Sequence, residues 1–273
     1  MTVYDLHQIQ FQGTTYHGLS SGEGSFVALH FHGTWGNFYE NPFALGLAAT
    51  YNATGLMYAS VNIPGHDGES IAEDFDDSLE AISAWVEHFL PTSEGRLLIQ
   101  GHSLGSLKVL KWLAEGPDEL TGRVAGTVLL SPFDLVAFYG GVDDDNLLSR
   151  RSYVQAQVAE GGMDSFVEKS IFDTWPIAAG PFLRATESGG PWDVFPARNG
   201  SVGLLAKTYA PTMAFIGGDD FAALPSVEHV LTTIRQGPHV HLEFVPGAPH
   251  NFAGHKSVVA EAIARLLAQV LTV

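Results

Sequence analysis

Two hydrophobic patterns alternate along most of the chain. Short runs that are almost entirely apolar recur between segments in which apolar residues return at helical spacing. The apolar runs are typical of strands buried on both faces of a sheet, and they occupy residues 25–31, 55–63, 96–100, 124–131, 212–217 and 240–245. The helical spacing predicts helices over residues 42–51, 75–89, 103–116 and 257–270. This alternation predicts an α/β fold, with a mostly parallel central sheet and helices on both faces.

The amino-terminal segment follows a different pattern. Residues 3–11 and 14–19 flank Gly13 and predict an antiparallel hairpin. Residues 1–10 lack the basic stretch and apolar run of a signal peptide. No segment approaches the roughly 20 apolar residues that cross a bilayer. We therefore expect a cytoplasmic protein that does not bind membranes.

One long segment, residues 135–208, fits neither pattern. It is too long for a simple crossover between strands and too aromatic for a linker. We expect it to be a cap or lid inserted into an α/β core that comprises residues 1–134 and 209–273, packed over the carboxyl ends of the strands. Its aromatic residues are Phe138, Tyr139, Tyr153, Phe166, Phe172, Trp175, Phe182, Trp192 and Phe195.

Charge and cysteine content exclude several classes of function. The chain carries 30 acidic and 13 basic residues, a formal net charge of −17. No basic stripe is present to neutralise phosphates, so nucleic acid and anionic membranes are not expected partners. The chain has no cysteine, which excludes disulfides, thiolate catalysis and cysteine-based zinc sites. A small-molecule substrate remains the expected partner, and the sequence does not indicate an oligomeric state.

The strongest chemical signal is Gly101-His102-Ser103-Leu104-Gly105, which fits the pattern G-x-S-x-G. It lies between the apolar run 96–100 and an amphipathic helix, the context that a nucleophile elbow requires. The sharp turn would expose the Ser103 hydroxyl at the helix amino terminus, where the helix dipole favours developing negative charge. We therefore expect Ser103 to be a nucleophile.

Five segments, spread over nearly the whole chain apart from the insertion, together resemble the α/β-hydrolase superfamily. A stretch within residues 32–43 also resembles a branch of siderophore esterases. The resemblance implies the α/β-hydrolase fold and a catalytic order of nucleophile, acid and histidine. It rests on FHGTWGN (31–37), NIPGHDGES (62–70), GHSLGS (101–106), IGGDDFAALP (216–225) and GAPHNF (247–252).

The resemblance implies the partners of Ser103. His250 follows the last predicted strand and is the expected general base, because a neutral imidazole can accept the serine proton near neutral pH. The acid that orients this imidazole is expected after the strand 212–217, where G-x-x-D spacing selects Asp220. Asp219, one residue earlier, and Asp134, after the preceding strand, remain alternatives.

An acyl-transfer intermediate also needs two donors for its oxyanion. The N–H of Leu104 is expected to be one donor, and by resemblance the N–H of Thr34 is the other. Trp35 and Phe38, in the same loop as Thr34, and His102, beside the nucleophile, are expected to line the substrate pocket.

Other motifs do not indicate a cofactor or a metal. His30 and His32, like His239 and His241, are two residues apart, but the Asp and His of a dinuclear metallohydrolase do not follow. Neither a dinucleotide-binding nor a P-loop motif is present.

The predicted function is that of a serine hydrolase, carboxylesterase-like, acting through an acyl-enzyme on Ser103. We expect an ester, lactone or thioester of a small or medium apolar or aromatic substrate. Two alternatives remain open: a thioesterase or acyltransferase for carrier-linked chains, and a ligand-binding protein that keeps the fold without hydrolysis.

Overall fold

The computed structural model describes residues 3–39, 42–72, 74–92, 94–167 and 177–270. Within these residues, eight strands form one sheet in the spatial order β1-β2-β4-β3-β5-β6-β7-β8. The pairs β1–β2 and β2–β4 are antiparallel, whereas all the other pairs are parallel. The strands are β1 (Asp5–Phe11), β2 (Thr14–Ser21), β3 (Phe26–Phe31), β4 (Met57–Val61), β5 (Arg96–His102), β6 (Val124–Leu130), β7 (Thr212–Asp219) and β8 (Val240–Pro249).

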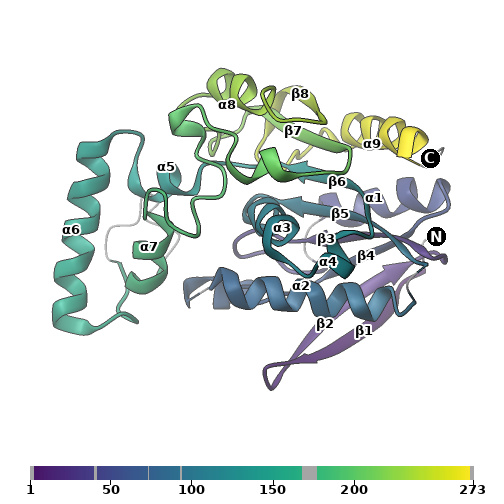
Figure 1. Cartoon of the computed structure of the whole chain (residues 1–273), viewed down its shortest axis with the longest axis horizontal. Helices are drawn as coiled ribbons and strands as arrows, with labels where there is room; N and C mark the ends of the chain where they lie inside the picture. The colour runs from purple at the N-terminus through teal and green to yellow at the C-terminus, as the bar shows by residue number, and fades with distance from the viewer. Residues whose placement is uncertain (1–2, 40–41, 73, 93, 168–176, 271–273) are drawn as a thin grey trace.

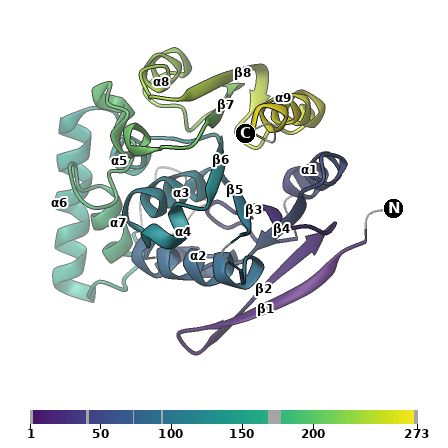
Figure 2. The same ribbon diagram turned by 45° about the vertical axis from the view of Figure 1, so that its right-hand side comes forward.

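Helices cover both faces of the sheet, as Figures 1 and 2 show. The α-helices are α1 (Pro42–Ala53), α2 (Phe75–Phe89), α3 (Leu104–Glu115), α4 (Asp118–Thr121), α5 (Leu135–Gly140), α6 (Asp144–Gly161), α7 (Ala179–Ala185), α8 (Val227–Ile234) and α9 (Lys256–Val270). Three short 3₁₀ helices are η1 (Asp67–Ala72), η2 (Ala197–Asn199) and η3 (Gly203–Lys207). Among the described helices, none is both long and apolar enough to cross a membrane.

The core is divided by the sheet into two apolar layers. Trp85 of α2, Trp112 of α3 and Ile234 of α8 pack on one face, and Tyr51 of α1 and Leu266 of α9 pack on the other. These five side chains are almost completely buried. The predicted α/β class, with a mostly parallel sheet between two helical layers, is therefore confirmed.

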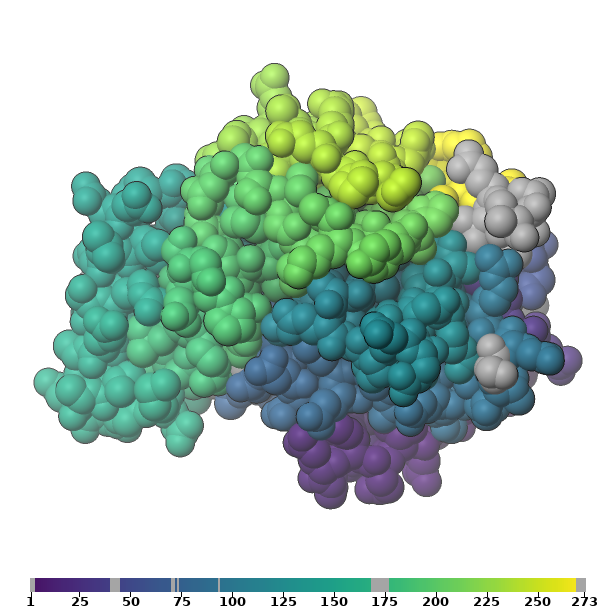
Figure 3. Space-filling view, viewed as in Figure 1, coloured from purple at the N-terminus to yellow at the C-terminus, as the bar shows by residue number. Residues whose placement is uncertain are grey.

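The segment between β6 and β7 extends the molecule at the end of the sheet where the parallel strands finish (Figures 1 and 3). It contributes α5, α6 and α7, and its last part returns to the core, where η3 packs on α3. Phe172 and Trp175, two of its expected aromatic residues, lie outside the described residues. Buried Arg198 ties the segment together through ion pairs with Asp134 and Asp193.

Candidate active site

Ser103 occupies a strained turn between β5 and α3. Its φ is 55° and its ψ is −124°, a conformation that a residue with a Cβ adopts only when the surrounding structure imposes it. The Ser103 N–H donates to the Leu130 carbonyl at 2.8 Å, which fixes the turn to β6. The Ser103 side chain makes no capping hydrogen bond to α3, so the hydroxyl does not serve the helix.

Two glycines allow this turn to pack tightly. A Cβ on Gly101 would lie 2.4 Å from the Gly105 carbonyl oxygen, and a Cβ on Gly105 would lie 2.5 Å from the Phe31 and His32 carbonyl oxygens. All of these neighbours are main-chain atoms, so a side chain at either position would have to displace the backbone. The elbow therefore depends on both glycines of the motif.

The structure brings Ser103, His250 and Asp220 together from three separate loops. His250 Nε2 lies 2.8 Å from Ser103 Oγ, and His250 Nδ1 lies 2.7 Å from Asp220 Oδ1. All three residues are buried, with exposed fractions of 8%, 7% and 6% for Ser103, His250 and Asp220. The three side chains form one continuous hydrogen-bonded chain from a carboxylate to a hydroxyl, the geometry of a nucleophile, its base and an orienting acid.

Asp220 is held as a carboxylate. Burial alone would raise its pKa, but the hydrogen bond and charge interaction with His250, the Ser131 hydroxyl and the Ala222 N–H outweigh burial and leave the pKa of Asp220 below its ordinary value. The Ala222 N–H lies 2.9 Å from Asp220 Oδ1. A carboxylate can only accept hydrogen bonds, so an ionised Asp220 places the proton of neutral His250 on Nδ1 and leaves Nε2 free to accept from the serine.

The two alternative acids lie elsewhere. Asp219 is exposed at the end of β7. Asp134 is completely buried, but its carboxylate caps α5 by accepting from the Ala137 N–H and pairs with Arg198 at 2.8 Å. Of the three candidate acids, Asp220 is the one in contact with His250.

The loop after β3 lies directly against the serine. A Cβ on Gly33 would lie 2.7 Å from Ser103 Cβ and 3.2 Å from Ser103 Oγ. Thr34 follows Gly33 in a tight turn closed by the Gly36 N–H and the Gly33 carbonyl, and Trp35 in this turn has a φ of 60°. On the other side of the hydroxyl, Leu104 begins α3, where N–H groups have no partner within the helix. Thr34 thus follows the residue that contacts Ser103, and Leu104 follows Ser103 itself; their roles as oxyanion donors stay a prediction.

A small apolar pocket opens beside Leu104, between the core and the insertion. Its volume is about 20 Å³, little more than one water molecule occupies, and Phe75 stacks on Trp192 within it at a ring separation of 4.6 Å. Sequence reasoning did not find this pocket, because its residues lie far apart in the chain. They are Phe75, Leu104, Leu135, Tyr139, Ile177, Pro181, Ala185 and Trp192.

Trp35, Phe38 and His102 lie outside this apolar pocket. The Phe38 N–H donates to Asn62, and His102 Nε2 contacts the His250 carbonyl, so both are held by the loops that carry the site. Their contact with a substrate stays a prediction.

Aromatic rings also pack around His250. The Phe221 and Phe133 ring centres lie 4.9 and 6.2 Å from that of His250, and Phe138 packs on both. Phe221 is 48% exposed, so it stands at the rim of the site. Sequence reasoning missed this cluster, although Phe221 directly follows the predicted acid.

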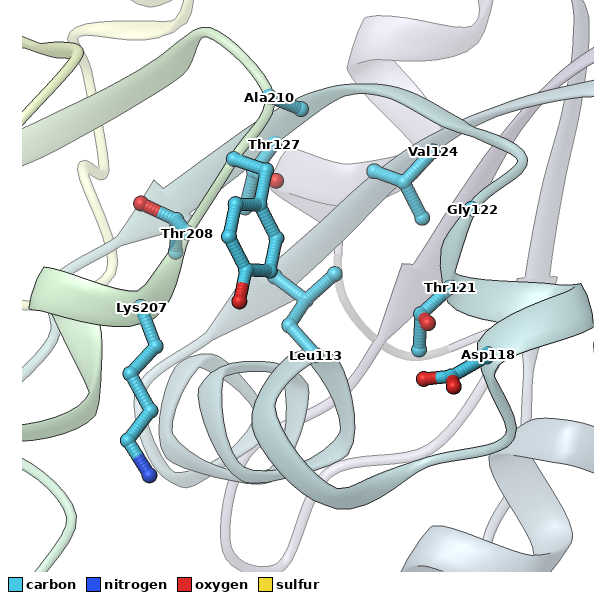
Figure 4. Close-up of a pocket in the computed structure, with 10 residues that line it drawn as sticks. Leu113, Asp118, Thr121, Gly122, Val124, Thr127, Lys207, Thr208 and Ala210 are labelled. Atoms are coloured by element: carbon cyan, nitrogen blue, oxygen red, sulfur yellow. The ribbon is translucent and has the colours of Figure 1, made fainter.

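A second pocket, of about 370 Å³, lies at the opposite end of the sheet. Figure 4 shows Lys207, Thr208 and Ala210, from the segment before β7, near Leu113 of α3 and Thr127 of β6. None of the residues of the Ser103 site lines it. Of these two pockets, the one beside Leu104 lies next to the serine.

The histidine pairs noted in the sequence bind neighbouring protein groups. Gln100 Nε2 donates to His30 Nδ1 at 2.7 Å, His32 Nδ1 lies 2.9 Å from the Gly33 carbonyl, and His241 lies 3.1 Å from Glu243. Within the described part of the chain, no three His, Cys, Asp or Glu side chains gather as a metal site.

Comparisons with known proteins bear on the fold. No family model matches the chain, and no curated protein matches it. Among solved structures, Est1E from Butyrivibrio proteoclasticus with ferulic acid bound has a TM-score of 0.72 at 16% identity, over 98% of this chain and 100% of its own. A monoglyceride lipase variant from Saccharomyces cerevisiae has a TM-score of 0.69 at 14% identity, over 99% and 96%.

A thioesterase domain from the curacin biosynthetic pathway is similar as well, with a TM-score of 0.61 at 16% identity, over 97% of this chain and 99% of its own. Together these structures show that the protein has the α/β-hydrolase fold, which confirms the resemblance drawn from the sequence. The narrower resemblance to siderophore esterases stays a prediction. Identities this low show the fold and leave the substrate to be argued from the site.

Proposed function

We propose that this protein is a serine hydrolase that cleaves carboxylic esters of small apolar or aromatic compounds through an acyl-enzyme on Ser103. The observation that carries the proposal is the continuous chain from Asp220 through His250 to Ser103, with contacts of 2.7 and 2.8 Å. The strained backbone of Ser103 supports it, because such strain is concentrated at functional sites.

The proposed reaction has two steps. Ser103 Oγ attacks the substrate carbonyl while His250 Nε2 takes the hydroxyl proton, and the resulting oxyanion accepts from the Leu104 and Thr34 N–H groups. The intermediate expels the alcohol, which receives its proton from His250. Water then attacks the acyl-enzyme, again with His250 as general base, and releases the acid and free Ser103. Asp220 holds the imidazole and stabilises its positive charge.

The pocket beside Leu104 supports the choice of substrate. It lies next to an expected oxyanion donor, and its walls are apolar and aromatic, which favours an apolar or aromatic group at the ester. The rings of Phe75 and Trp192, stacked on each other, form part of its wall. The net charge of −17 disfavours polyanionic substrates. Est1E, a similar structure, binds ferulic acid, an aromatic acid.

The insertion over residues 135–208 is proposed to act as a cap. Tyr139 and Trp192, from its two ends, line the pocket, so the insertion would select substrates by shape. A cytoplasmic location also stays a prediction.

The first test is reaction with a fluorophosphonate, read by the intact mass of the protein. We expect one adduct on the wild type and none on Ser103→Ala. A folded wild type that forms no adduct would refute the proposal and favour the ligand-binding alternative.

The second test compares p-nitrophenyl acetate, p-nitrophenyl cinnamate and an acyl-coenzyme A thioester as substrates. Preference for the cinnamate would support an aromatic acyl group in the pocket. Preference for the thioester would favour the thioesterase alternative. Trp192→Ala, which opens the pocket without touching Ser103, should reduce kcat/KM for the cinnamate more than for the acetate.

A further inference from the structure

The main-chain carbonyl of His250 accepts two side-chain hydrogen bonds. Ser131 Oγ donates to it at 2.8 Å, and His102 Nε2 lies 3.1 Å from it. Ser131 follows β6 and His102 ends β5, so two neighbouring strands reach across to the loop that carries the imidazole. The two donors are separated from His250 by 119 and 148 residues.

Ser131 is a strained residue with a completely buried side chain. Its φ is 51°, in the region that favours glycine, and its N–H donates to the Phe215 carbonyl at 2.9 Å. Because glycine would adopt this conformation more easily, a serine here implies that the hydroxyl has a role that outweighs the strain.

His102 is suited to the same contact. Burial and the neighbouring His250 lower the pKa of His102 to about 4, so its ring is neutral at neutral pH and carries one N–H. A carbonyl oxygen can only accept a hydrogen bond, so that N–H is on Nε2 and points at His250. The ring centres of the two histidines lie 5.4 Å apart.

We propose that Ser131 and His102 are positioning residues that hold the His250 carbonyl. This inference rests on the proposed function. The imidazole must contact Ser103 and Asp220 at the same time, and a displacement of about 1 Å in such a site costs on the order of 100-fold in rate. Buried Phe252 anchors the loop between β8 and α9 further on, whereas the two contacts to the His250 carbonyl hold the residue that carries the imidazole.

The test uses the full-length protein and p-nitrophenyl acetate. Ser131→Ala removes the hydroxyl and keeps the strained backbone, whereas Ser131→Gly removes both. We expect kcat to fall by about 10- to 100-fold in both variants with little change in KM. An equal fall in both would assign the effect to the hydroxyl. Recovery of the wild-type kcat in Ser131→Gly would overturn the proposal.

Thr208→Val is the matched control. The Thr208 hydroxyl is also buried and donates to a main-chain carbonyl, that of Leu205, but it lies at the opposite end of the sheet. We expect this variant to lose some stability and keep kcat. A similar fall of kcat in Thr208→Val would show that loss of any buried hydroxyl is sufficient, and would overturn the proposal.

His102 provides an independent arm if the Ser131 variants fold poorly. His102→Gln keeps an N–H donor near the same position, whereas His102→Leu does not, so the glutamine variant should retain most of the kcat that the leucine variant loses. The low-field proton resonance of the His250–Asp220 hydrogen bond should broaden or shift in Ser131→Ala and in His102→Leu. An unchanged resonance together with unchanged kcat would overturn the proposal.

Failure of this inference is distinguishable from failure of the proposed function. If the wild type reacts with the fluorophosphonate and hydrolyses the ester, but all the Ser131 and His102 variants keep its kcat, the positioning role is wrong and the hydrolase remains. If the wild type does neither, the proposed function itself is wrong.

Discussion

Arg198 is the residue whose removal should most directly reveal how the insertion is held to the core. Its Nη1 atom lies 2.8 Å from Asp134 Oδ1, and its Nη2 atom lies 2.6 Å from Asp193 Oδ2. The Asp134 side chain is completely buried, and those of Asp193 and Arg198 are at most 9% exposed. Arg198→Met would keep much of the volume of the side chain and remove its charge, leaving two buried carboxylates without their counter-ion.

The loss of folding free energy expected for Arg198→Met depends on the contacts that the two carboxylates keep. Removal of one partner from a buried ion pair costs about 3–5 kcal/mol, because the other charge stays buried. Asp134 would keep its hydrogen bonds from the Ala137 and Arg198 main-chain N–H groups, which places the loss near the lower limit. A loss of about 3 kcal/mol lowers the melting temperature of a chain of this size by roughly 6–12 °C.

Calorimetry and urea unfolding measure this loss, and the double variant Asp134→Asn/Arg198→Met is the control. With the Asp134 charge also removed, the double variant should recover part of the stability that Arg198→Met loses. A fall of less than about 2 °C in Arg198→Met would refute the reasoning, since it is below the range for any buried pair. The double variant also tests Asp134 as the acid: we expect kcat near the wild-type value, whereas loss of a triad acid would lower it about 10⁴-fold.

Three further predictions concern the site and its support. Asp220→Asn should lower kcat about 10⁴-fold without unfolding the protein, because an amide favours the wrong histidine tautomer. Asp219→Asn should leave kcat for ester hydrolysis unchanged; the reverse result would make Asp219 the acid in place of Asp220. Burial lowers the pKa of His32 to about 3, so His32 takes up a proton at a higher pH in the unfolded chain than in the folded protein. The contribution of neutral His32 to folding stability is therefore fully present above the unfolded pKa and is lost as the pH falls below that value. Between pH 8 and pH 5, protonation of His32 should lower the free energy of unfolding by about 2 kcal/mol. Urea unfolding at both pH values should show a smaller pH-dependent loss in His32→Gln than in the wild type; an equal loss in the two proteins would contradict this. Gly105→Ala should destabilise the fold by about 1–3 kcal/mol, because its Cβ would lie 2.5 Å from main-chain oxygens; unchanged urea unfolding would show that the elbow can relax.

The elements found from the sequence are those with a strong local pattern. The central strands are buried on both faces and therefore apolar throughout, and α2 and α9 carry continuous apolar stripes. The insertion helices were not predicted, because their signal is weak. Leu147 and Val154 are the buried residues among the 18 of α6, which has no such stripe. Helix α8, eight residues long, also escaped prediction, since so short a segment contains only two turns.

The residues of the site were predictable where a local pattern marks them, as it does the helices and strands. Ser103 is marked by a local motif between a strand and a helix, and His250 by its place after the last strand, both of which can be read along the chain. The pocket cannot be read in this way, since Phe75 and Trp192 meet only after folding. The same is true of Ser131, whose contact with the His250 carbonyl spans 119 residues.

The choice between Asp219 and Asp220 shows why the acid could not be settled by sequence pattern alone. Successive strand residues point to opposite sides, so one of the two carboxylates had to face away from His250, but the pattern does not say which. In the structure Asp220 is the one in contact with His250, beside an irregularity at the ends of β7 and β8, where Gly217 pairs with Val245 but Asp219 pairs with Pro249.

In a regular parallel pair Asp219 would lie opposite Gly247, two residues earlier in β8 than Pro249. Each strand residue advances the chain by about 3.3 Å, so the irregularity moves the start of the histidine loop by roughly 7 Å relative to β7. That displacement is more than twice the 2.7 Å contact between Asp220 and His250. Gly217 permits it, because a Cβ there would lie 2.2 Å from the Ala248 carbonyl oxygen. The acid is thus selected by the close approach of two main chains, a contact that depends on both strands and cannot be read from either alone.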